Sequence, residues 1–202
     1  MPYLIDAPMD ESSVTKDFEP KLKLDDRLDL LRLLTKLTKL QAEEIESIPG
    51  TLIAGEPRDK GSFPDVLGWN LGPWIVSPRL REIIETLESG VHDFVPIHVM
   101  REDGKSDQGT YYIVVINHLM DALLYEKTQF VHGMGLDAAK NSNYTILPGP
   151  NHCVLDVGAI QGHHLWRAPD PMRYCYFCSD ELGNIFRSEG MRGWRLTACK
   201  AV

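Results

Sequence analysis

A short pattern that occurs twice in the chain constrains its fold more than any other feature. In the first copy, the apolar run Trp74-Ile75-Val76 is followed by Ser77 and Pro78. Serine is a favoured helix N-cap, and proline suits the first helical position because its missing N–H would have no partner there. The next apolar residues have helical spacing and share one face, and Gly90 supplies a stop: Leu80, Ile83, Ile84 and Leu87. The pattern predicts a strand, a short helix and a second strand.

The second copy lies near the end of the chain, where Ser179 follows the apolar run 174–178. Aligning the two serines places Leu80 on Leu182 and Ile83 on Ile185 without a gap. We therefore expect two similar strand–Ser cap–helix–strand units, with these four apolar residues buried. Two copies are too few for a solenoid. The pattern therefore indicates either a duplicated unit or the same local structure formed independently at two places.

The remaining segments predict an α+β fold: a mainly antiparallel, mixed sheet with helices on one face. Leucines crowd residues 26–46, which we expect to form the longest helix. Residues 111–116 are apolar at every position, as in a central strand covered on both sides, and a hairpin should join them to 96–99. Further strands are expected at 51–54, 153–157, 163–168 and 173–178, whereas 121–125 fits strand or helix equally well.

The length of 202 residues favours one domain over two, because domains commonly have about 100–200 residues. Residues 1–20 contain few apolar positions, and we expect a weakly held arm with a possible edge strand at Tyr3–Asp6. Residues 132–151 are rich in Gly, Asn and Pro and predict a long loop, a feature that is usually functional or disordered.

Composition excludes several classes of function. A net charge of −8 and a pI near 5.3 argue against a protein that binds nucleic acid by neutralising phosphates. The sequence has no basic segment followed by an apolar core at its start, and no apolar run approaches the ~20 residues of a membrane span. We expect a cytoplasmic protein with reduced cysteines that binds neither nucleic acid nor membrane.

No catalytic motif is evident. The chain lacks Gly-x-Ser-x-Gly, a phosphate-binding glycine loop and His-Glu-x-x-His. Cys175 and Cys178 are three positions apart in a predicted strand, so their thiols should face opposite ways and cannot share one metal ion. We expect no metal, no cofactor and no enzymatic activity. The alternative is a small enzyme with a scattered His/Asp site, for which the candidates are His92, His98, His163, His164 and Asp121.

Of these candidates, His92 and His98 lie at even spacing in one predicted strand. They should share a face, and we expect both to be solvated.

Several short motifs, taken in order, resemble immunity family eleven of bacterial polymorphic-toxin systems. They begin with Phe63-Pro64-Asp65 and the run 75–80, continue with Phe94-Val95-Pro96 and the run 162–167, and end with Gly193-Trp194. The resemblance covers about residues 63–198. One departure is Trp166, which stands where the family usually has phenylalanine.

The resemblance implies an immunity protein that binds a cognate toxin and neutralises it as a stoichiometric complex. A further alternative, also a binding protein, is a module that serves a larger complex. An aromatic residue in a Gly/Pro-rich loop and the polar 132–151 loop are the best candidates for the contact surface. We therefore expect partner-binding residues at Trp69, Asp137, Asn141, Asn143 and Tyr144.

Overall fold

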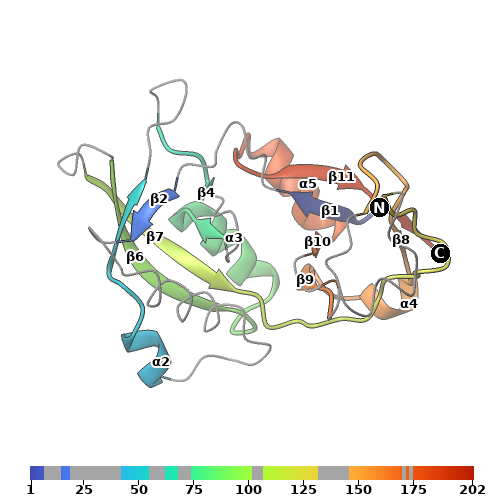
Figure 1. Ribbon diagram of the computed structural model, residues 1–202, viewed down its shortest axis with the longest axis horizontal. Coiled ribbons are helices and arrows are strands. Elements are labelled where there is room, and N and C mark those ends of the chain that lie inside the picture. Colours follow the sequence, from blue (N-terminus) through green and yellow to red (C-terminus); the bar gives the residue numbers. More distant parts are fainter. Residues whose placement is uncertain are drawn as a thin grey trace. The chain divides into compact units, whose positions relative to one another are not determined.

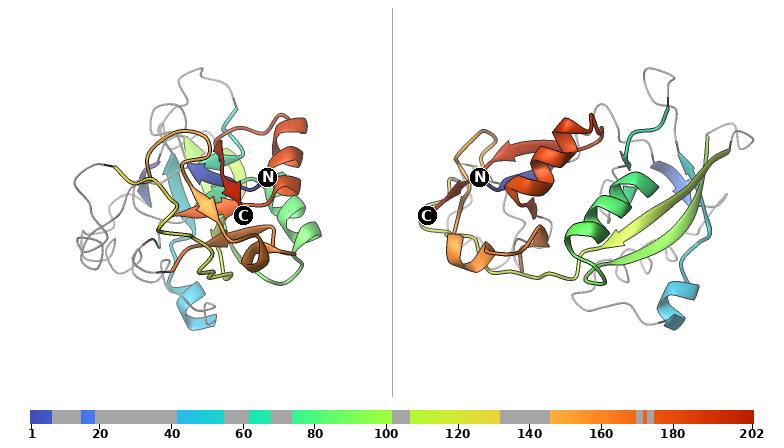
Figure 2. Two further views of the ribbon diagram at one scale, coloured as in Figure 1. Left: turned by 90° about the vertical axis from the view of Figure 1, so that its right-hand side faces the viewer. Right: turned by 180° about the vertical axis from the view of Figure 1, so that it is seen from behind.

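The computed structural model describes residues 1–6, 15–18, 42–54, 62–67, 74–101, 107–131, 146–169, 172 and 175–202. The chain divides into two compact units (Figures 1 and 2). Unit 1 combines Met1–Asp6, His118–Gly190 and Arg195–Val202, and unit 2 combines Ala7–Asn117 and Met191–Trp194. The chain therefore passes from one unit to the other four times, after residues 6, 117, 190 and 194.

Unit 2 contains a six-stranded sheet. Its order is β2 (Thr15–Phe18), β3 (Thr51–Ala54), β6 (Asp93–Arg101), β7 (Asp107–Val115), β5 (Ile75–Val76) and β4 (Val66–Leu67). Only β3 and β6 pair in parallel, so the sheet is mixed and mainly antiparallel, as predicted. The hairpin between β6 and β7 is confirmed, and β7 is an inner strand.

The two faces of this sheet follow the period of two along each strand. Val95, Ile97 and Val99 of β6 face one core cluster together with Ile113 of β7. Ile45 of the short helix α2 (Ala42–Glu46) packs against the same cluster. Helix α3 (Pro78–Leu87) lies along β7, and the Arg81 guanidinium of this helix sits 4.3 Å from the ring centre of Tyr112. The hairpin is therefore packed on both sides.

Unit 1 contains a four-stranded antiparallel sheet of order β11 (Arg195–Ala198), β1 (Tyr3–Asp6), β10 (Tyr176–Cys178) and β9 (Leu165–Arg167). β1 pairs with neighbours on both sides, and Tyr3 and Ile5 are buried. The predicted strand at Tyr3–Asp6 is thus confirmed, but its expected position at the edge is wrong. Four residues between two prolines, Pro2 and Pro8, look like a weak strand in the sequence, but pairing with residues 176–178 and 195–198 places them inside the sheet.

Four further elements complete unit 1. β8 (Val154–Leu155) pairs in parallel with β12 (Lys200–Ala201), and α4 (Val157–Ile160) follows β8. Helix α5 (Asp180–Ser188) follows β10. The three predicted strands between 153 and 178 therefore exist as β8, β9 and β10, each shorter than expected.

Side chains of the unit 1 sheet form rows across its strands. The register aligns Thr197, Leu4, Phe177 and Trp166 on one face, with Leu4, Phe177 and Trp166 in a core cluster that also holds Cys153 and Leu155. The adjacent row, which includes Tyr3 and Cys178, lies on the face covered by α5. A Cβ on Gly183 of α5 would come within 2.6 Å of the Tyr3 ring, so the helix approaches the sheet closely. Cys175 packs with the first cluster, and the two thiols face opposite ways as predicted.

Both serine caps are present. The Ser77 Oγ accepts a hydrogen bond from the Leu80 N–H (3.2 Å), and the Ser179 Oγ accepts one from the Leu182 N–H (3.1 Å). Each helix lies between two strands, β5 and β6 in one unit and β10 and β11 in the other. Leu80 and Leu182 are buried, as expected.

Ile83 and Ile185 are only half-buried, which corrects the expectation that they are core residues. The buried positions that accompany Leu80 and Leu182 are Ile84 and Phe186. At about 100° per residue, the i+3 position lies roughly 80° from the middle of the face that i and i+4 define. Both isoleucines therefore lie at the margin of the buried face.

Other predictions fall largely outside the described residues. Of the long helix expected over 26–46, only α2 lies inside them. Residues 7–14 and 19–20 of the expected arm and residues 132–145 of the expected loop also lie outside. That the two units form a single domain stays a prediction.

Candidate functional site

Several of the motif residues that carry the family resemblance meet in unit 2 and serve packing, whereas the run 162–167 belongs to unit 1. The Asp65 carboxylate accepts hydrogen bonds from the Ser77 Oγ (2.9 Å) and from the Arg192 N–H (3.1 Å). The Asp65 backbone oxygen accepts a third, from the Ser77 N–H (2.8 Å). One carboxylate thus links the cap of α3 to the 191–194 segment.

Gly193 and Trp194 complete this contact. Gly193 has a φ of +108°, and a Cβ there would lie 2.2 Å from the backbone oxygen of Val66. The Trp194 ring packs on Trp74 with 5.1 Å between ring centres. We call Asp65, Ser77, Arg192, Gly193 and Trp194 the motif junction. Its groups hydrogen-bond to and pack on one another, and they hold the start of α3 against the 191–194 segment.

His92 is buried, which corrects the prediction of a solvated histidine. Its Nδ1 accepts a hydrogen bond from the Asn117 N–H (3.2 Å), so the proton of the neutral ring belongs to Nε2. That N–H points at the buried Glu88 carboxylate 2.9 Å away. His92 therefore connects the end of α3 to the residues that follow β7.

His98 does not share this environment. It lies within β6, whereas His92 precedes that strand. Its side chain is 42% exposed and contacts Asp107 at 3.1 Å. The expected shared face of the two histidines is thus not found.

The other candidates for an enzyme site belong to unit 1. His163 and His118 contact each other through ring nitrogens 3.2 Å apart, with ring centres 4.4 Å apart. His164 Nδ1 lies 3.0 Å from the Ser179 Oγ, the cap of α5. Asp121 is exposed. Each histidine thus has a local structural contact, and His92 and His98 belong to a different unit from the rest.

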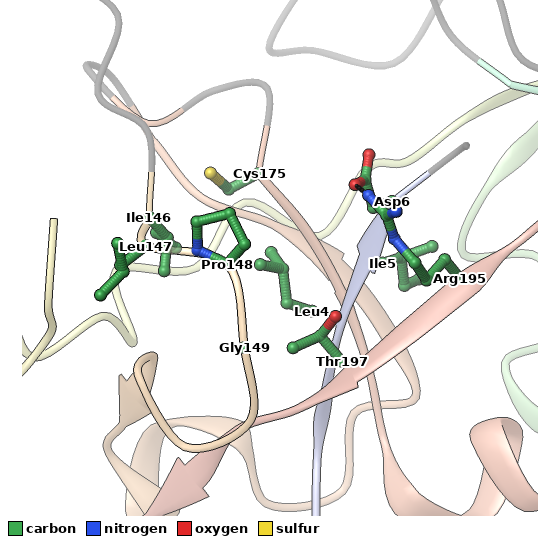
Figure 3. Close-up of a pocket in the computed structure, with 10 residues that line it drawn as sticks. All are labelled: Leu4, Ile5, Asp6, Ile146, Leu147, Pro148, Gly149, Cys175, Arg195 and Thr197. Atoms are coloured by element: carbon green, nitrogen blue, oxygen red, sulfur yellow. Dashed lines mark hydrogen bonds and ion pairs between the residues drawn. The ribbon is translucent and has the colours of Figure 1, made fainter. Parts of the chain in front are cut away.

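A cavity of about 560 Å³ in unit 1 is the best candidate for a binding site (Figure 3). Its floor is the sheet face that carries Leu4 and Thr197, with Asp6 and Arg195 at one end. Its opposite wall is the segment Ile146–Gly149. The full lining is Leu4, Ile5, Asp6, Ile146, Leu147, Pro148, Gly149, Cys175, Arg195 and Thr197.

The chemistry of this lining suits binding. The Arg195 guanidinium forms an ion pair with the Asp6 carboxylate, so the two charges offset each other. Burial, with smaller contributions from Cys199 and Asp6, raises the pKa of the Cys175 thiol to about 12. The thiol is therefore protonated near neutral pH and is a poor nucleophile. Leu4, Ile146, Leu147 and Pro148 leave an apolar surface between these groups.

The cavity wall adjoins the predicted partner-binding loop. Phe130 and Ile146 form a β-bridge, and the Leu147 N–H donates to the Gln129 oxygen (2.8 Å). The chain thus leaves and re-enters the described fold at one place, beside the cavity. Sequence reasoning missed this cavity because its parts come from residues 4–6, 146–149, 175 and 195–197. The only local signal was the Pro148-Gly149 pair, a turn that closes the loop.

The residues predicted to bind a partner lie outside the described residues: Trp69, Asp137, Asn141, Asn143 and Tyr144. Their role stays a prediction. Where the chain is described, it contains no helix with the length and apolar character needed to cross a membrane.

Comparison with known proteins agrees with the motif resemblance. A model of the immunity protein family Imm11 matches residues 4–201. The match is nearly as long as the chain, and it includes the segment before Phe63, which the motifs did not cover. No curated protein matches the chain at a significant level. Because the match extends from β1 to β12 and thus through both units, the chain belongs to the Imm11 immunity protein family.

Proposed function

We propose that this protein binds a cognate toxin of a bacterial polymorphic-toxin system and neutralises it as a stoichiometric complex in the cytoplasm of the producing cell. The family match over residues 4–201 carries this proposal, because it assigns the chain to immunity proteins. The motif junction is consistent with this proposal, since its residues are used for packing. Recognition would then depend on surfaces outside the motifs.

The contact surface we propose includes the cavity in unit 1 and the loop that begins and ends beside it. The cavity supplies apolar area, which drives association, and a neutralised ion pair at one end. The loop would supply Asp137, Asn141, Asn143 and Tyr144. Trp69, which falls within unit 2, is a separate candidate for an aromatic contact. The net charge of −8 would speed the encounter with a basic toxin surface.

Co-expression tests the function directly. The polypeptide encoded next to this chain is expressed in bacteria with and without it, and growth is measured. We expect growth arrest without this protein, rescue with it, and co-purification of the two chains in equal amounts. Protection by far fewer copies of this protein than of toxin would indicate turnover and would contradict a stoichiometric mechanism.

A loop deletion tests the proposed surface separately from the function. Removing residues 141–143 should leave folding intact, because the entropy of loop closure changes slowly with length. Protection should fall. Deleting Gly104–Lys105, which fall between β6 and β7 in the sequence, provides a control at a different connection. Full protection by the folded 141–143 variant would exclude the loop tip from the interface.

A further inference from the structure

The outer edge of β11 has an open backbone position. In an antiparallel pair, alternate residues direct their N–H and C=O groups toward the partner strand. The Cys199 N–H donates to the Pro2 oxygen (2.8 Å), and in the same register Thr197 is opposite Leu4 and Arg195 is opposite Asp6. These residues therefore bond to β1. Leu196 and Ala198 have the other parity and direct their backbone groups away from β1.

Part of this outer edge is already covered. The Asn151 N–H donates to the Ala198 oxygen from the outside (2.8 Å), and β8 then pairs with β12. Before Asn151 the chain turns away from the edge, with left-handed φ values of +63° at Asn151 and +129° at Gly149. Residues 146–149 form the cavity wall instead.

Among the residues that the structure describes, the edge is thus paired from Ala198 onward and open at Leu196. β11 is the outermost strand of its sheet, and the Leu196 N–H and C=O have no backbone partner among the described residues. The side chains on either side of it, Arg195 and Thr197, line the cavity. An open donor and acceptor therefore lie directly beside an apolar cavity.

We propose that this edge binds an extended segment of the toxin, which adds to β11 as a strand in line with β8. The proposal rests on the proposed function and identifies how part of the complex would form. Strand addition supplies main-chain hydrogen bonds, and alternate side chains of the added segment face opposite sides of the sheet. The side chain beside Thr197 would enter the cavity over Leu4 and Pro148.

The chemistry of the site describes the segment. The cavity side favours an apolar side chain, because Leu4, Ile146, Leu147 and Pro148 form much of its lining and the Asp6–Arg195 ion pair lies at one end. The segment should carry no net negative charge, since this protein has a charge of −8. A second copy of the chain carries the same −8, so electrostatic repulsion disfavours self-pairing of two β11 edges. The toxin is therefore the better occupant.

Replacing Leu196 with proline tests the hydrogen bond. Proline removes the outward N–H and leaves the bonds that Arg195 and Thr197 make to β1, and proline is tolerated on edge strands when its nitrogen faces outward. Leu196→Ala is the matched control, because it shortens the same side chain and keeps the N–H. Affinity is measured by calorimetry with purified toxin from the co-expression test, after circular dichroism shows both variants folded. We expect binding to weaken about 10-fold for Leu196→Pro and less than about 3-fold for Leu196→Ala.

Hydrogen exchange on the wild-type protein provides a measurement that needs no variant. The Leu196 amide should exchange at least about 10-fold more slowly in the toxin complex than in the free protein. Equal affinities of the two variants, together with unchanged Leu196 exchange in a complex that still protects cells, would overturn strand addition and leave the proposed function standing. Concentration-dependent dimers of the wild type that Leu196→Pro abolishes would overturn it in favour of a second copy. Failure of the wild type to bind toxin at all would refute the proposed function itself.

Discussion

At the scale of single residues, Asp65 and Gly193 of the family motifs hold the fold of unit 2 together. Asp65 accepts three hydrogen bonds through its side chain and backbone, and Gly193 allows the backbone of the 191–194 segment to approach Val66. These contacts give the motif residues a structural role in unit 2. The motifs therefore predict the family better than they predict the binding surface.

Replacing Gly193 with alanine should destabilise the protein by more than about 3 kcal/mol. A positive φ costs a non-glycine residue about 1–2 kcal/mol, and the added Cβ would also meet the Val66 backbone oxygen at 2.2 Å. Gly90→Ala is the control, because Gly90 has a φ of +69° with no atom near the new Cβ, and it should cost about 1 kcal/mol. Urea unfolding measures both. Equal decreases in the free energy of unfolding for the two variants would show that the close approach at Val66 does not contribute to the cost.

At the scale of elements, short sequence patterns correctly predicted the elements that depend on neighbouring residues alone. The two serine caps, the helices after them and the β6–β7 hairpin all follow from short patterns. β1 could not be placed this way, because its central position depends on pairing with residues more than 170 positions away. The cavity was missed for the same reason. Its floor and wall come from strands and a turn that become neighbours only in the folded sheet.

The margin position of Ile83 on α3 leads to a second prediction. Leu80→Ala should cost about 2–5 kcal/mol, because Leu80 is fully buried and its removal leaves a cavity. Ile83→Ala should cost less than about half as much, since Ile83 is half-buried and its site is partly open to water. Both positions are helical, so the comparison isolates burial. Chemical denaturation measures the difference, and equal costs would show that Ile83 is a core residue after all.

At the scale of the whole molecule, the contacts divide the chain into two units, but the chain itself passes repeatedly between them. Each unit is assembled from separate segments, and the chain crosses between the units four times. β1 enters the middle of the unit 1 sheet, while residues 191–194 leave unit 1 to join unit 2 and then return as β11. No single cut in the chain releases one complete unit. Unfolding of unit 2 would release the 191–194 segment from its contacts, and β11 begins directly after that segment.

We therefore expect the two units to unfold together, in one cooperative transition. Trp166 is the only tryptophan in unit 1, and Trp69, Trp74 and Trp194 fall within the residue ranges of unit 2. In a Trp166→Phe variant, fluorescence reports on unit 2 alone, whereas far-UV circular dichroism reports on both units. Coincident urea midpoints for the two signals are the expected result, because two-state unfolding gives the same transition with every probe. The same measurement on a Trp74→Phe variant controls for the loss of one aromatic core residue. Separate midpoints would show that the units are independently stable, and the single domain predicted from the sequence would then be wrong.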